Sequence, residues 1–185
     1  WNSISLKGNI AIKYYMTLSD DVLADETAYM QFTMADGEII TVPVSAGIPT
    51  QVGDEILYLF TCAVNAKEMT DDVLAQCFYE GGASRVYTYS VKAYCDHVLK
   101  NSTDEALKDL VRKMLNYGAA AQMLFNHNVE KLANASLSDA DKVLPSVDAS
   151  AYKYAISGKE DGIRAQSATL MLEDVVKVRV YFALT

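Results

Sequence analysis

The chain has 185 residues, of which 51% are hydrophobic, and a formal net charge of −8. A chain of this length and composition can bury a core without metal ions or disulfide bonds. The negative charge disfavours nucleic acid and anionic membrane surfaces as partners, because both are bound by clustered Lys and Arg. The apolar runs are too short to cross a bilayer, so we expect no membrane insertion.

The first third of the chain has the two-residue period of β-strands. Apolar residues alternate from Ile10 to Leu18, which predicts a strand with one buried face, and Gly8-Asn9 predicts a hairpin back to residues 4–6. Asp36-Gly37 predicts a second hairpin between alternating segments. Pro43 cannot donate a hydrogen bond to a neighbouring strand, which predicts that its strand lies at a sheet edge.

Three further segments predict strands. Residues 56–64 are apolar on both faces, which is typical of a central strand covered on both sides. Residues 73–79 and 85–89 predict an antiparallel pair joined around Gly81-Gly82.

A helical period follows. Ser90 is a predicted N-cap for a helix ending near Lys100, and Ser102 with Glu105 has the spacing of a capping box for a second, longer helix. Gly118 and the alanines at 119–121 interrupt the bulky side chains of the second helix. We therefore expect another element to approach its backbone closely there.

These patterns predict an α+β fold with antiparallel, sandwich-like β-sheets and an inserted helical hairpin packed on one face. We expect one compact domain over residues 1–185. Its predicted parts are a β-rich part (1–89), a helical hairpin (90–133), a loop-rich connection (134–167) and the start of a second copy of the N-terminal β-hairpin (168–185).

The second copy is predicted from a match between the two ends of the chain. When Ile4 is aligned with Leu170, the alternating segment that ends at Leu18 falls on the segment that ends at Leu184. Two unrelated hairpins also alternate, but the shared turn register favours duplication. The duplication predicts a chain cut from a longer protein, and a core containing Ile12, Met16, Val178 and Phe182.

The three cysteines are Cys62, Cys77 and Cys95. No CxxC motif is present and the chain has 2 histidines, so a structural zinc site is not expected. A Cys62–Cys77 disulfide remains open as an alternative. Three small, buried, reduced side chains are the favoured interpretation.

Several short motifs in the second half and centre of the chain are distinctive: Ala66–Met69, Tyr89–Val91, Ala93-Tyr94, Met114–Gln122, Phe125-Asn126 and Leu132–Asn134. Together they resemble an uncharacterised domain of large secreted or cell-surface proteins from anaerobic Gram-positive bacteria. In those proteins the domain accompanies leucine-rich repeats and immunoglobulin-like modules. The resemblance implies an extracellular or cell-surface location and supplies no catalytic residues.

Catalytic chemistry finds little support in the sequence. Cys95, Asp96 and His97 are consecutive, so on a helix they do not face one another, although His127 could supply a base from elsewhere. Acidic pairs at 20–26, 71–72 and 139–141 could act in glycoside hydrolysis or hold calcium, but an acidic chain supplies such pairs by chance. We expect no catalytic, cofactor or metal site, with calcium as an open alternative.

The main expectation is therefore a non-catalytic structural or interaction module whose partner is a neighbouring domain, another protein or a carbohydrate. The first alternative is a carbohydrate-binding module, because tyrosines two apart on a strand share a face on which sugar rings could stack. The second alternative is an unrecognised hydrolase. The candidate ligand-facing tyrosines are Tyr87, Tyr89, Tyr152 and Tyr154.

Overall fold

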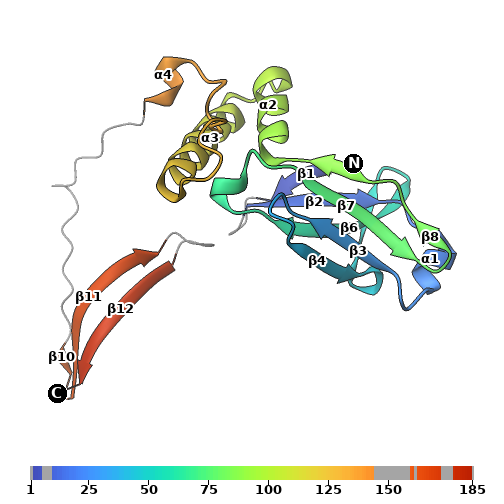
Figure 1. Ribbon diagram of the computed structural model, residues 1–185, viewed down its shortest axis with the longest axis horizontal. Coiled ribbons are helices and arrows are strands. Elements are labelled where there is room, and N and C mark those ends of the chain that lie inside the picture. The colour runs from blue at the N-terminus through green and yellow to red at the C-terminus, as the bar shows by residue number, and fades with distance from the viewer. Residues whose placement is uncertain (1, 6–9, 144–158, 161, 172–176, 185) are drawn as a thin grey trace. The chain divides into compact units, whose positions relative to one another are not determined.

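A computed structural model (Figure 1) describes residues 2–5, 10–143, 159–160, 162–171 and 177–184. The chain divides into two compact units, residues 1–142 and residues 143–185. The single compact domain expected from the sequence is thus replaced by two units, each of which forms its own sheets.

The first sheet has the strand order β1-β2-β6-β5, and each neighbouring pair is antiparallel. Ile12, Tyr14 and Met16 of β2 are buried, as the alternation predicts for Ile12 and Met16. The central position of β6 is confirmed, but Ile56 is exposed, so the predicted cover on both faces is incomplete. The strands are β1 (Asn2–Ser5), β2 (Ala11–Met16), β5 (Ile48–Val52) and β6 (Glu55–Ala63).

The second sheet has the order β4-β3-β7-β8, and β9 also pairs with β7. The turn between β3 and β4 contains Gly37 at φ +90°, a conformation that glycine adopts without strain. Pro43 lies in the edge strand β4, as predicted. The strands are β3 (Tyr29–Thr33), β4 (Ile39–Pro43), β7 (Val73–Tyr79), β8 (Gly82–Ala83) and β9 (Tyr87–Tyr89).

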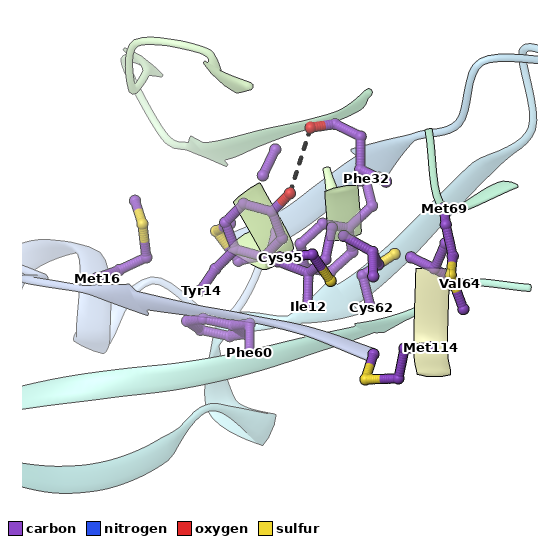
Figure 2. Packing of buried hydrophobic residues seen from close by; sticks show 14 of the residues in the cluster. Ile12, Tyr14, Met16, Phe32, Phe60, Cys62, Val64, Met69, Cys95 and Met114 are labelled. Carbon is purple, nitrogen blue, oxygen red and sulfur yellow. Dashed lines mark hydrogen bonds between the residues drawn. The ribbon is translucent and has the colours of Figure 1, made fainter. Parts of the chain in front are cut away.

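The two sheets share one apolar core (Figure 2). The rings of Tyr14 and Phe32, one from each sheet, have centroids 5.3 Å apart. The Tyr14 hydroxyl donates a hydrogen bond to the Val73 carbonyl oxygen at 3.2 Å, so its one polar group is satisfied. Burying each large side chain contributes roughly 1.5–3 kcal/mol. The α+β fold with sandwich-like sheets is thereby confirmed.

Two helices follow the sheets, α2 (Val91–Asn101) and α3 (Glu105–Phe125). The Ser90 hydroxyl accepts the Ala93 N–H, which confirms the first predicted cap. The predicted Ser102–Glu105 capping box is wrong: the Asp104 carboxylate caps α3 by accepting the N–H groups of residues 106 and 107. Asp104 lies directly before the helix, where a carboxylate can satisfy two free donors and interact favourably with the helix dipole.

The small residues of α3 do allow a close approach. A Cβ atom at Gly118 would lie 2.6 Å from the Met69 Sδ atom and 3.3 Å from the Ala66 carbonyl oxygen. The approaching element is the short 3₁₀ helix η2 (Ala66–Glu68), together with Met69 directly after it. Other short elements of this unit are α1 (Asp20–Ala24), η1 (Val44–Ala46) and α4 (Asp139–Lys142).

Residues 143–185 contain one described sheet in the order β10-β11-β12. The predicted C-terminal strand is present, but Val178 and Phe182 are 67% and 60% exposed, so the prediction that they lie in a core is wrong. Within the described residues of this unit, no second layer covers their face. The strands are β10 (Lys159–Glu160), β11 (Ile163–Met171) and β12 (Lys177–Leu184).

The hairpins at the two ends of the chain have the same register. Ile4 pairs with Ile12 in β1–β2, and the aligned residues Leu170 and Val178 pair in β11–β12. Every other cross-strand pair of β1–β2 also has its aligned counterpart in β11–β12.

The helices of the described part of the chain include none that is long and apolar enough to cross a membrane.

Candidate functional site

The tyrosines predicted to face a ligand do not form an open platform where the structure describes them. Tyr87 and Tyr89 of β9 are half-buried and pack against the core. The Arg85 guanidinium lies over the Tyr87 ring, 4.6 Å from its centroid. Burial raises the pKa of the Tyr89 hydroxyl. Tyr152 and Tyr154 lie outside the described residues.

The residues of the Cys-Asp-His run on α2 point to different surroundings. Cys95 is fully buried, and burial raises the pKa of its thiol to about 12, which disfavours the reactive thiolate. Asp96 forms an ion pair with Lys92 at 2.7 Å. His97 is exposed, and its Nδ1 atom lies 3.1 Å from the Asn101 amide nitrogen. The three side chains therefore do not assemble into a nucleophile with a base.

Cys62 and Cys77 are also buried and reduced, as the favoured interpretation of the sequence expected. Burial raises the pKa of the Cys62 thiol to about 11 and also raises that of Cys77. All three cysteines therefore act as small core residues.

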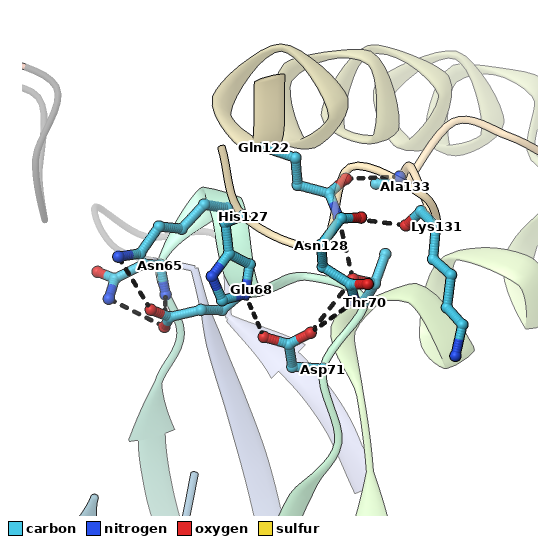
Figure 3. Close-up of polar contacts among 10 residues, drawn as sticks. Asn65, Glu68, Thr70, Asp71, Gln122, His127, Asn128, Lys131 and Ala133 are labelled. Carbon is cyan, nitrogen blue, oxygen red and sulfur yellow. Dashed lines mark hydrogen bonds and ion pairs between the residues drawn. The ribbon is translucent and has the colours of Figure 1, made fainter. Parts of the chain in front are cut away.

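The most concentrated polar cluster joins the turn before β7 to the segment after α3 (Figure 3). Asn126 ends α3 in the left-handed conformation, φ +51°, and the chain then turns back towards the sheets. The His127 Nε2 atom lies 2.6 Å from an Asp71 carboxylate oxygen. The other Asp71 oxygen accepts a hydrogen bond from the Asn128 amide at 3.2 Å. His127 therefore pairs with Asp71, and the open possibility that it serves Cys95 is not realised.

Gln122 is the buried centre of the same cluster. Its amide nitrogen donates to the Thr70 hydroxyl and to the backbone carbonyls of residues 128 and 131, at 3.1, 3.4 and 3.2 Å. Its amide oxygen accepts the Ala133 N–H at 2.7 Å. One fully buried side chain thus satisfies the backbone of the loop after α3.

A small hollow of about 20 Å³ lies beside this cluster. Three of its five acidic side chains take part in local structure: Glu68 accepts from the Asn65 amide, Asp36 from the Glu38 N–H, and Asp71 from the Asn128 amide. Among the described residues, no cluster of His, Cys, Asp or Glu has a geometry that could hold a metal ion. The hollow is lined by Met34, Ala35, Asp36, Glu38, Glu68, Asp71, Asp72, Val73 and His127.

Some acidic residues of the other two segments, 20–26 and 139–141, take part in similar contacts. Asp139 and Asp141 lie in α4, where Asp139 pairs with Lys142 at 3.6 Å and Asp141 pairs with Arg112 at 3.4 Å. The carboxylate of Asp25 accepts hydrogen bonds from the Thr27 side chain and backbone and from the backbone N–H of residue 80. These bonds hold the Asp25 pKa below its usual value. These contacts are ion pairs and turn hydrogen bonds that stabilise the local fold.

The hairpin β11–β12 presents the clearest candidate interaction surface. Val178, Val180, Phe182 and Leu184 alternate along β12 and therefore share one face. Each is exposed, from 44% for Val180 to 85% for Leu184. Ile163, Ala165 and Ala168 of β11 pair with residues of this set and extend the same face, which we call the β12 apolar face.

Sequence reasoning identified the β12 residues of this face but expected them to be buried, and it wrongly placed residues 163–167 of β11 in a loop-rich connection. It missed the Asp71–His127 pair, because the two residues are far apart in the chain. Gln122 was missed as well, although its position one helical turn after Gly118 on α3 signals a buried polar residue.

Comparisons with known proteins identify no relative. A scan against family models, a search of curated proteins and a search of solved structures each returned no match to this chain. The resemblance to bacterial surface domains therefore stays a hypothesis, and function has to be argued from the surfaces of the chain itself.

Proposed function

We propose that this chain is a non-catalytic structural or interaction module of a secreted or cell-surface bacterial protein, and that its terminal hairpins arose by duplication. The observation that carries the proposal is the β12 apolar face, with Phe182 at 60% and Val178 at 67% exposure. Contiguous exposed apolar surface of this kind marks sites where proteins bind one another.

The polar clusters support the same proposal. A hydrolase site needs titratable groups that converge on space for a substrate. Asp71 and His127 instead bind each other, and Gln122 binds the backbone between residues 128 and 133. These interactions hold the helices on the sheets. The carbohydrate-binding alternative is weakened because Tyr87 and Tyr89 pack against the core.

Site-specific photocrosslinking tests the proposal. A benzoylphenylalanine placed at Phe182 reports on the β12 apolar face, and one placed at the neighbouring Tyr181 reports on the opposite face of the same strand. In the cells that make the protein, we expect crosslinks to polypeptide from position 182 and few from position 181. Equal crosslinking at both positions, or none, would contradict the proposal.

A further inference from the structure

Strand β12 has an open edge as well as an open face. In the order β10-β11-β12 it pairs with β11 on one side, and no described residue of its unit pairs with the other side. An open edge carries unpaired backbone N–H and C=O groups, which can receive a further strand.

The matching hairpin shows what occupies such an edge. By the shared register, β12 corresponds to β2 and β11 corresponds to β1. The equivalent edge of β2 is filled by β6, an antiparallel strand that places Cys62 opposite Ile12 and Phe60 opposite Tyr14. All four of these side chains are buried. A hairpin of this register therefore takes a strand with apolar residues at alternate positions.

We infer that the edge of β12 accepts an added antiparallel strand with apolar residues at alternate positions, as in β6. The inference rests on the proposed function and specifies its partner. Main-chain hydrogen bonds along the edge supply affinity, and apolar residues opposite Val178, Val180 and Phe182 supply selectivity for the alternating pattern.

Charge argues against a second copy of this chain as the occupant. The face of the hairpin opposite the β12 apolar face carries Arg164, Lys177 and Arg179, and the described residues of β11 and β12 include no Asp or Glu. A second β12 strand paired at this edge would bring its own Lys177 and Arg179 onto that polar face, where like charges that come opposite one another are destabilising. A strand with neutral polar positions fits better, because in the matching hairpin β6 places Thr61 opposite Lys13, the residue aligned with Arg179.

The test measures binding of a fluorescent peptide to the full chain by anisotropy. The probe has the sequence of residues 55–63 with terminal lysines for solubility, and the control peptide has the same composition without the alternation. We expect saturable binding of the probe, and binding at least about tenfold weaker for the control peptide. Binding should be weakened equally for a probe that is N-methylated at alternate residues, because this probe cannot form hydrogen bonds along a strand edge. This comparison requires no change to the protein.

Variants of the chain locate the site. Val178→Lys and Phe182→Lys should each weaken probe binding about tenfold. Ile48→Lys should leave it unchanged, because Ile48 is a comparably exposed apolar residue (59%) on the edge strand β5 of a different sheet.

Three results would overturn the inference: equal binding of the control peptide, equal binding of the N-methylated probe, or binding unaffected by both lysine variants. A chain that sediments as a dimer and excludes the probe would show that a second copy fills the edge, which also overturns it. Crosslinking from position 182 without probe binding would leave the proposed function standing and refute strand addition alone.

Discussion

At the scale of single residues, a few buried side chains determine how the helices attach to the sheets. Gln122 is fully buried and all of its amide atoms are hydrogen-bonded. We predict that Gln122→Met, which keeps the length but removes the polar atoms, lowers the free energy of unfolding by about 1–3 kcal/mol, because the loop backbone loses its partners. Gln51→Met on exposed β5 should change it by less than about 0.5 kcal/mol in the same urea titration. Equal effects of the two changes would contradict the role given to Gln122.

A second prediction at the scale of single residues concerns Gly118. A side chain there would enter space held by Met69 and by the Ala66 carbonyl oxygen. Gly118→Leu should therefore cost about 1–3 kcal/mol by overpacking, or prevent folding. Ala120→Leu, on the exposed side of α3, is the matched control and should be close to neutral. Equal melting temperatures for the two variants would show that η2 does not constrain α3 at this position.

At the scale of elements, the carboxylate of Asp25 links the end of α1 to the turn after β7. Its hydrogen bonds lower its folded-state pKa, so the ionised form stabilises the fold above the unfolded value of about 3.9, and this contribution is lost as the pH falls through the folded pKa. Asp25→Ala should therefore destabilise the chain at pH 7 and progressively less towards pH 2. Glu26→Ala, at an exposed neighbouring position, serves as the control. A penalty for Asp25→Ala that did not change with pH would contradict this role.

Local elements were largely predictable because their signals are local. Alternation predicted β2 and β12, Asp36-Gly37 predicted a hairpin, and Ser90 predicted the start of α2. The capping residue of α3 was assigned wrongly because Ser102 and Asp104 can both cap a helix, and Ser102 instead follows the end of α2. The spacing of residues along the sequence does not show which of the two caps the helix.

At the scale of the whole molecule, alternation predicts that a strand has an apolar face but not what covers that face. Ile12 and Val178 occupy matching positions in matching registers, yet Ile12 is buried and Val178 is 67% exposed. The difference comes from non-local pairing: β2 has β6 at its side and a second sheet against its face. The Asp71–His127 pair was unpredictable for the same reason, since only the tertiary fold brings the two residues together.

The central claim is that the β12 apolar face is open in this chain and is covered by a partner. Tryptophan fluorescence tests this most directly, in a chain that carries Trp1→Phe and Phe182→Trp, with Tyr181→Trp in place of Phe182→Trp as the control. We predict that the emission of tryptophan at position 182 is that of a water-exposed indole in the free chain, and that it shifts to the blue when a partner strand is added, while position 181 shifts less. Blue-shifted emission at position 182 in the free monomeric chain would show that the face is already buried, and would contradict the account.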